Sequence, residues 1–250
     1  MSPDFINAKL KTKEIIDPLD PDLSDLYKNV WRKCFPLDLL PFKAFKQKVK
    51  ERKFQEGVYH VVVLKNADGA VVAGLSFYFF HEKKKNGFAF GADEYIGVVP
   101  DLRKKGLGMK LVGLRTKILS SDARTAGKNR IEFIMGEYYD EKKISPAMAR
   151  KDGFDPYQRK NFWKKAGMKA LAFDYENPSI FDHRKIERVY TVGIKIADSC
   201  YRRKIPAVFV ASMLSAYYRH FYGVRDNHAV MRRLRSVLKG RDFIKVIELV

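Results

Sequence analysis

The sequence contains little cysteine, histidine and tryptophan. Of its 250 residues, two are cysteine, five are histidine and two are tryptophan. Cys34 and Cys200 allow at most one disulfide, and because Cys34 lies on the apolar face of an expected helix, we expect buried thiols instead. The histidines show no H-x-x-x-H or Cys/His spacing, so we expect no metal site. No G-x-S-x-G turn occurs either, which argues against a serine-hydrolase nucleophile.

The chain also has no apolar run long enough for a membrane helix. Its longest apolar stretch, residues 71–80, is far short of the roughly 20 residues that a membrane helix requires. The opening Met-Ser-Pro-Asp-Phe lacks the basic and then apolar pattern of a signal peptide. We therefore expect a cytoplasmic protein with no membrane span.

Acidic residues are few relative to basic ones. The chain has 49 Lys and Arg against 29 Asp and Glu, a formal net charge of +20. This excess predicts attraction to anions such as CoA, nucleic acid, anionic lipid or an acidic carrier protein, without choosing among them. The charge is concentrated toward the C-terminus, in residues 184–250. A composition of 46% hydrophobic and 31% charged residues is that of a soluble globular protein.

Residues 94–112 are the most informative segment. A β-branched run ends at Val98 and Val99, where Pro100 has no N–H to offer a strand ladder. From residue 107 onward apolar residues recur at helical spacing, which predicts a helix over about 107–124. Gly106 and Gly108 therefore lie at the beginning of a helix. There the first backbone N–H groups lack partners and the helix dipole is positive, so an anion can bind.

The residues of this turn suit a pyrophosphate, and we call residues 98–109 the cradle. Glycine allows a phosphate to approach the backbone, and Arg103, Lys104 and Lys105 add positive charge. Neither G-x-x-x-x-G-K-[ST] nor G-x-G-x-x-G occurs, which excludes the common triphosphate and dinucleotide loops. The pattern that does occur, R-x-x-G-x-G, resembles the signature of the GCN5-related N-acetyltransferase (GNAT) superfamily.

A second segment strengthens this resemblance. Residues 161–168, Asn-Phe-Trp-Lys-Lys-Ala-Gly-Met, are similar to the second GNAT signature, a short helix that ends at a glycine before a strand. The resemblance covers about residues 58–197 and points to a less characterised branch with a C-terminal extension. It implies an α/β (α+β) fold, with a mostly antiparallel central sheet flanked by helices. It also implies a GNAT domain at 1–200 and a basic, mainly helical extension at 201–250 packed on it.

Hydrophobic patterning predicts the order of elements that the resemblance implies. We expect helices at about 24–34 and 42–49, then paired strands at 58–65 and 71–81 joined by a turn. The cradle strand and its helix follow, then a strand at 130–137 and a last hairpin of 171–175 with 189–196. Residues 6–15 are compatible with an edge strand. Residues 137–158 show no sustained periodicity, which predicts a long loop that is either a substrate-recognition segment or a plain surface insertion.

The resemblance further implies acetyl-CoA as co-substrate, with no metal. By analogy with the superfamily motifs, the residues expected to hold it are Val98, Val99, Arg103, Lys104, Lys105, Gly106, Leu107, Gly108, Met109, Phe162 and Trp163. In the superfamily the strand backbone at Val98 and Val99 binds the pantetheine arm.

Amine acetylation requires an unprotonated amine, a polarised thioester carbonyl and a proton for the leaving thiolate. Strand alternation places Glu94 on one face with Ile96 and Val98, and the superfamily often has a base there. The alternative is a strand-end carboxylate in solvent. Glu137, on the next strand, is expected to receive a cationic amine or to act as base, or else to form a structural ion pair.

The sequence offers several proton donors for the thiolate. The superfamily usually has a tyrosine four residues before the glycine of the second signature, and here that position is Trp163, whose indole cannot donate a proton in practice. Tyr157 is our candidate acid, with Tyr138 and Tyr139 nearby. Solvent or the product amine could also supply the proton.

The C-terminal extension holds an expected helix after Pro206, a basic helix and a final strand from Phe243. Packing on the core, homodimer formation and binding of an anionic partner all stay open for it. We conclude that the sequence predicts an N-acetyltransferase that moves the acetyl group of acetyl-CoA directly to an unknown amine. Two alternatives remain: an N-acyltransferase that uses a longer acyl-CoA or an acyl carrier protein, and a non-catalytic module that binds nucleic acid.

Overall fold

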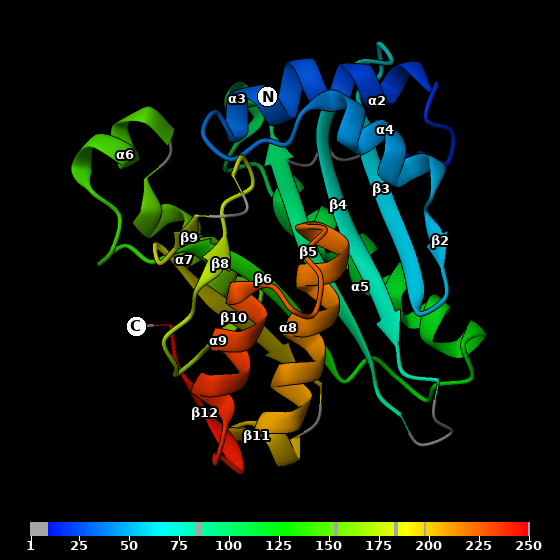
Figure 1. Cartoon of the computed structure of the whole chain (residues 1–250). Helices are drawn as coiled ribbons and strands as arrows, with labels where there is room; N and C mark the ends of the chain where they lie inside the picture. Colours follow the sequence, from blue (N-terminus) through cyan, green and yellow to red (C-terminus); the bar gives the residue numbers. More distant parts are fainter. Residues whose placement is uncertain (1–9, 84–86, 153–154, 183–184, 198, 250) are drawn as a thin grey trace. The chain divides into compact units, whose positions relative to one another are not determined.

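A computed structural model describes residues 10–83, 87–152, 155–182, 185–197 and 199–249 (Figure 1). The chain divides into two compact units, which we describe separately. Unit 1 contains Met1–Ile131 with Lys151–Gly153, and unit 2 contains Glu132–Arg150 with Phe154–Val250. The extension at 201–250 thus belongs to the same unit as the strands that directly precede it.

Unit 1 is built on an antiparallel sheet. Its strands run in the order β1 (Lys11–Glu14), β3 (Gly57–Lys65), β4 (Val71–His81) and β5 (Ala89–Val98), and β2 (Lys53–Phe54) pairs with β3. The predicted hairpin is confirmed, and β4 is buried along almost its whole length, which explains its unbroken apolar sequence. Of the expected edge strand at 6–15, residues 1–9 lie outside the described residues and 11–14 form β1.

Helices cover both faces of the unit 1 sheet. One face carries α2 (Pro21–Asp25), the π-helical η1 (Leu26–Trp31), α3 (Arg32–Cys34) and α4 (Phe42–Lys50). The other carries α5 (Leu107–Thr125), which follows the 3₁₀ turn η2 (Pro100–Leu102). Both helical layers approach the sheet closely, because a Cβ at Gly74 would lie 2.2 Å from Leu26 and one at Gly91 would lie 2.4 Å from Leu119 of α5.

A β-bulge interrupts β5 in the middle. Ser76 of β4 lies opposite Tyr95, but its neighbour Phe77 lies opposite Asp93, so Glu94 is the extra residue of β5. The bulge changes which side chains share a face. Glu94 contacts Ser76, whereas Ile96 lies opposite Leu75 on the other face of the sheet. The expectation that Glu94 shares a face with Ile96 and Val98 is therefore wrong, because simple alternation assumes a continuous ladder.

Unit 2 is also built on an antiparallel sheet. Its strands run in the order β6 (Phe133–Tyr139), β10 (Tyr190–Ile196), β7 (Lys169–Leu171), β12 (Phe243–Ile247) and β11 (Lys204–Pro206). The short pair β8 (Asn177–Pro178) and β9 (Ile186–Glu187) is separate. The remaining elements are α6 (Pro146–Asp152), α7 (Pro156–Lys165), the 3₁₀ turn η3 (Ser199–Tyr201), α8 (Ala207–Phe221) and α9 (Ala229–Leu238).

The fold class expected from the sequence is confirmed: both units carry antiparallel sheets with flanking helices, and the elements follow the expected order. Three expectations need correction. The strand expected at 171–175 is the shorter β7, which ends at Leu171. The segment 137–158 is not one long loop, because it contains α6 and the first turn of α7. Neither cysteine forms a disulfide, and the expectation of buried thiols holds for Cys34 but not for Cys200, which is exposed in η3.

Candidate functional site

In unit 1, the cradle joins β5 to α5 through η2. Gly106 is the N-cap of α5 with φ of +82°, and no side chain caps this helix end. A Cβ at Gly106 would meet no atom within 4 Å, so the backbone here faces open space. A left-handed, uncapped helix N-terminus with open space before it matches what an anionic ligand requires.

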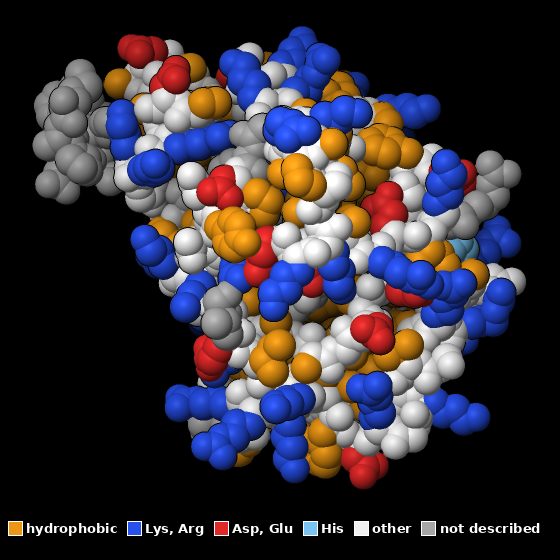
Figure 2. All heavy atoms as spheres, turned by 90° about the vertical axis from the view of Figure 1, so that its left-hand side faces the viewer, with side chains coloured by type: hydrophobic (Ala, Val, Ile, Leu, Met, Phe, Trp, Pro, Cys, Tyr) orange, Lys and Arg blue, Asp and Glu red, His pale blue; other side chains and the backbone are white. Residues whose placement is uncertain are grey.

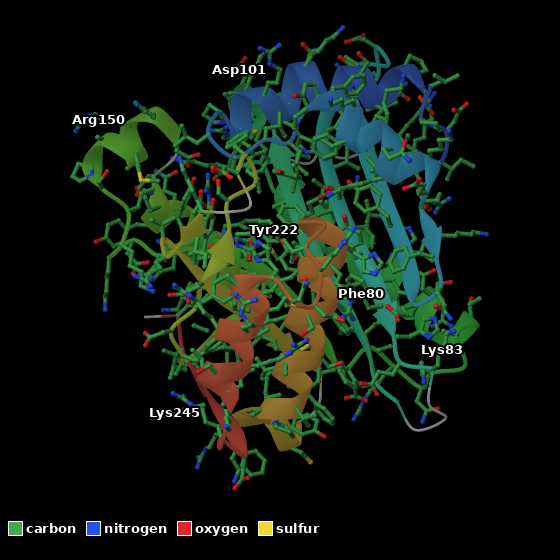
Figure 3. All side chains as sticks on the ribbon, in the orientation of Figure 1. Phe80, Lys83, Asp101, Arg150, Tyr222 and Lys245 are labelled. Carbon is green, nitrogen blue, oxygen red and sulfur yellow. The ribbon has the colours of Figure 1, made fainter. Side chains whose placement is uncertain are left out.

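Cationic residues precede this helix end. Lys104 has φ of +62°, the sole positive value among the described residues that are not glycine, and such a conformation costs about 1 kcal/mol or more for a side chain with a Cβ. Arg103 is held against the end of β5, where its Nε donates to the carbonyl of Val98 over 3.3 Å. Asp101, labelled in Figure 3, lies in η2 at the start of this turn. The cradle is thus a fixed turn with positive charge on it.

The bulge residue Glu94 occupies a buried polar cluster of unit 1. Its side chain has no exposed surface, and one oxygen pairs with the ammonium of Lys48 from α4. The other oxygen accepts hydrogen bonds from the hydroxyls of Tyr59, at 2.5 Å, and Ser76, at 2.7 Å. We call these four residues the Lys48–Glu94 cluster. Within the ion pair of Lys48 and Glu94, only the Lys48 side chain reaches solvent, with 15% of it exposed.

Burial shapes the protonation of this cluster. Burial lowers the pKa of Lys48, and the charge and hydrogen bond of Glu94 oppose that shift. Burial and the negative charge of Glu94 raise the pKa of Tyr59 well above its usual value, and the same two causes act on Tyr78. Both tyrosines are therefore neutral across the physiological range, and Tyr59 is a permanent donor to the carboxylate.

A second buried ion pair connects the bulge to α5. Asp93, the residue before Glu94, pairs with the fully buried guanidinium of Arg115. Because α5 begins at the cradle, this pair fixes the helix that presents the cradle to the strand that carries Glu94. The two residues of this pair flank the segment 94–112, one on β5 and one on α5.

In unit 2, the second GNAT-like signature forms α7 and its C-terminal turn. Asp155 caps the helix by accepting from the backbone N–H of Tyr157, at 2.9 Å. Gly167, with φ of +80°, ends it, and the N–H of Met168 returns to the carbonyl of Trp163 in a Schellman-type closure. The expectation of a short helix ending at a glycine before a strand is confirmed. Trp163 is buried, whereas Tyr157 is 61% exposed.

Glu137 of β6 is surrounded by tyrosines of unit 2. The hydroxyl of Tyr175 donates to one carboxylate oxygen, while Tyr222 and Tyr217 donate to the other at 2.6 and 3.4 Å. We call these four residues the tyrosine cluster; Figure 3 labels Tyr222 at the end of α8. Burial, and then the charge of Glu137, raises the pKa of Tyr222 well above its usual value. Two of these donors, Tyr217 and Tyr222, come from the extension at 201–250, and Tyr175 precedes it.

Another tyrosine of β6 has an unusual environment. Tyr138 is 3% exposed, and its hydroxyl has no hydrogen-bond partner among the described residues. A Cβ at Gly193 would lie 2.8 Å from the ring of Tyr138 and 3.2 Å from Met168, so Tyr138 lies near the last residue of the second signature. A buried hydroxyl without a partner is uncommon in a folded protein. It is a potential donor to a ligand.

Sequence reasoning singled out Glu94, Glu137 and the cradle as candidates, but it did not predict the groups that contact the two carboxylates. Lys48, Tyr59 and Ser76 in unit 1, and Tyr175, Tyr217 and Tyr222 in unit 2, carry no motif. Only for Ser76 did the sequence offer a signal, because the predicted pairing of the strands β4 and β5 brings it close to Glu94. Among the described residues no group of three His, Cys, Asp or Glu side chains could hold a metal ion. Nor is any helix in the described part of the chain long and apolar enough to cross a membrane.

Comparisons with known proteins give distant structural likenesses. No protein-family model and no curated protein matches the chain. Among solved structures, Arabidopsis thaliana NAA60 in complex with a bisubstrate analogue is similar with a TM-score of 0.49 and 12% identity, over 75% of this chain and 97% of that chain. Chaetomium thermophilum Naa20, also with a bisubstrate analogue, gives 0.47 and 12%, over 74% and 86%.

A candidate GNAT-family acetyltransferase from Desulfovibrio desulfuricans gives a TM-score of 0.45 and 13% identity, over 76% of this chain and 99% of that chain. Likenesses this distant say nothing of what this chain binds or modifies.

Proposed function

We propose that the chain is an acyl-CoA N-acyltransferase of the GNAT type that transfers the acetyl group of acetyl-CoA directly to an amine. The observation that carries the proposal is the cradle: an uncapped helix N-terminus, a left-handed Gly106 facing open space, and Arg103 and Lys104 beside it. These features favour a pyrophosphate-binding site over a plain turn, because a turn that binds no ligand would not need the strained backbone of Lys104.

The residues proposed to hold the cofactor are those of the cradle and of α7. The backbone N–H groups of residues 106–109 and the side chains of Arg103, Lys104 and Lys105 would hold its phosphates. The strand backbone at Val98 and Val99 would hold the pantetheine arm, and Phe162 and Trp163 would contribute from the second signature. When bound, acetyl-CoA supplies an activated acyl thioester.

Glu94 remains the proposed base. Because its side chain is fully buried and both of its oxygens accept hydrogen bonds, we propose that it exchanges protons through Lys48, which reaches solvent. Glu137 remains the proposed receiver of the cationic amine, with its charge held by tyrosine hydroxyls. Tyr157 is proposed as the acid for the leaving thiolate, and Tyr138, whose buried hydroxyl has no described partner, is the alternative.

The test is calorimetric binding of CoA, acetyl-CoA and longer acyl-CoAs to the full chain and to two matched variants. Gly108→Ala and Gly113→Ala each add one methyl group to α5 and favour the helix by up to about 1 kcal/mol. Gly113 is exposed and a Cβ there would meet nothing within 4 Å. We expect Gly108→Ala to weaken CoA binding at least tenfold, and Gly113→Ala to leave it unchanged.

Further outcomes identify the acyl donor and test Glu94 as the base. Equal binding to both variants would contradict the cradle assignment, and stabilisation by longer acyl-CoAs alone would move the donor away from acetyl-CoA. Glu94→Gln is expected to keep CoA binding but to lose most acetyl transfer in an amine screen. Full turnover of that variant would remove Glu94 from the mechanism.

A further inference from the structure

The strands β11 and β12 present an open face that the proposed acyl transfer does not use. They pair in antiparallel register at one edge of the unit 2 sheet. Their inward residues Ile205, Ile244 and Val246 are buried. The side chains that alternate with these are exposed, and we call them the open strand face: Lys204, Phe243, Lys245 and Ile247.

Two lysines lie directly opposite each other on this face. Lys204 pairs with Lys245 in the register of the two strands, and like charges directly opposite on one face of a sheet destabilise the pairing. Neither lysine forms a salt bridge with a residue that the structure describes, and the nearby Glu248 pairs with Lys169 instead. The repulsion between the two ammonium groups destabilises the pairing of β11 with β12 in the free protein. An anion bound between the lysines would remove this repulsion and stabilise the pairing.

Apolar side chains accompany the two lysines. Phe243 is 47% exposed and Ile247 is 41% exposed. The ammonium of Lys204 lies 4.2 Å from the centre of the Phe243 ring. An exposed aromatic ring beside paired cations can stack on a flat, electron-rich ligand while the cations neutralise its charge.

The flanks of the two strands extend the positive charge. Arg202 and Arg203 precede β11, and Lys239 and Arg241 precede β12, all with exposed side chains. Figure 3 labels Lys245 on β12. Figure 2 shows Lys and Arg side chains with apolar ones between them in its lower part, at the height where Figure 1 draws β11 and β12 together with the ends of α8 and α9.

We propose that the open strand face and its flanking arginines bind single-stranded nucleic acid, with Phe243 stacking on a base and Lys204 and Lys245 contacting phosphates. An acidic protein is the competing partner. Protein interfaces have an apolar centre from which lysine is depleted, whereas here two lysines occupy the centre. Alternating cations and an aromatic on an open strand face are instead what sequence-tolerant single-strand binding uses.

The test is fluorescence anisotropy of labelled RNA and DNA strands of about 20 nucleotides, which exceed one binding site of roughly 4–16 nucleotides. We expect binding to the full chain that weakens as salt rises. Lys204→Gln/Lys245→Gln should weaken it roughly tenfold and reduce the slope of log K against log salt by about 1.4, because each phosphate contact contributes about 0.7. Lys43→Gln/Lys50→Gln, which removes two exposed lysines of α4, should change it less than twofold.

Phe243→Ala separates stacking from charge. It should weaken binding roughly tenfold without changing the salt slope, because stacking is not ionic, while Phe243→Tyr should retain binding. Lys245→Glu adds a readout independent of binding. It places opposite charges across the two strands, so it should raise the melting temperature of the free protein while binding is lost.

Three results would overturn the proposal. One is the absence of binding to any strand at 150 mM salt. Another is an equal loss in the Lys43/Lys50 control, which would show only general charge attraction. The third is binding to polyglutamate or to an acidic carrier protein that requires Phe243 and the lysines while nucleic acid binding does not. None of these results depends on acyl transfer, so CoA binding by the same variants tests the proposed function separately.

Discussion

Each unit holds a carboxylate on a strand of its sheet, and the two units stabilise that carboxylate differently. In unit 1 the ammonium of Lys48 and two hydroxyls surround Glu94. In unit 2 three tyrosine hydroxyls donate to Glu137. An ion pair taken out of water depends on both partners, because the loss of one leaves an uncompensated charge. A carboxylate held by several hydroxyls loses its stabilisation in smaller steps.

The largest effect is expected from breaking the ion pair of unit 1. Lys48→Met leaves the buried charge of Glu94 without its cation, which should cost about 3–5 kcal/mol of unfolding free energy. Urea denaturation followed by circular dichroism measures this. The methionine keeps most of the volume of the lysine stem, so the loss reports the charge more than the packing.

The double variant Lys48→Met/Glu94→Gln is the control. It removes both charges, and we expect it to be more stable than Lys48→Met alone, because the uncompensated carboxylate is gone. Additive losses in the double variant would show that the two residues do not act as a pair.

A smaller effect is expected in unit 2. Tyr222→Phe removes a hydrogen bond of 2.6 Å to the carboxylate of Glu137 and one of 3.0 Å that the amide of Asn177 donates to the same hydroxyl, which should cost about 1.5–3 kcal/mol. Tyr217→Phe removes one of 3.4 Å and should cost less, since long hydrogen bonds are weak. Thermal denaturation of the two variants ranks them. A larger loss for Tyr217→Phe than for Tyr222→Phe would contradict the geometry of the tyrosine cluster.

The local parts of this comparison were predictable from the sequence. Periodicity and turn residues predicted the hairpin of β3 and β4, the helix α5 after Gly106 and the glycine end of α7. These features depend on residues close together in the chain. Both carboxylates were also found, because each lies on a predicted strand.

The partners of the carboxylates were not predictable, because they come from distant segments. Lys48 is 46 residues from Glu94, and Tyr222 is 85 residues from Glu137. The bulge at Glu94 was missed because strand alternation assumes a regular ladder. The short helix α6 was missed because its seven residues, mostly exposed, carry no apolar periodicity.

The smallest effect, and the one that separates the units most selectively, is a response to pH. Unit 1 also contains His60, whose ring nitrogens lie 2.9 Å from Glu14 and from Asp122 of α5. Burial lowers the pKa of His60, but hydrogen bonds and charges of the two carboxylates outweigh it, so the pKa is raised above its usual 6.5. A group whose pKa is higher in the folded than in the unfolded protein stabilises the fold fully at pH values below the pKa of the unfolded state. That stabilisation is lost as pH rises through the pKa of the folded state.

The stability of unit 1 should therefore fall as pH rises above about 6.5 and through the raised pKa of His60. The tyrosine cluster should not respond in this range, because the pKa of Tyr222 is raised by burial and by Glu137, so its contribution is lost only as pH rises beyond about 10. Hydrogen exchange resolved by segment measures the two units in one sample. After correction for intrinsic exchange, protection in β3 and α5 should decline from pH 6 to pH 9. His60→Gln should remove that decline. Protection in β6 and α8 should stay constant over this range in both proteins. An equal decline in both units would mean that His60 does not control the difference between them.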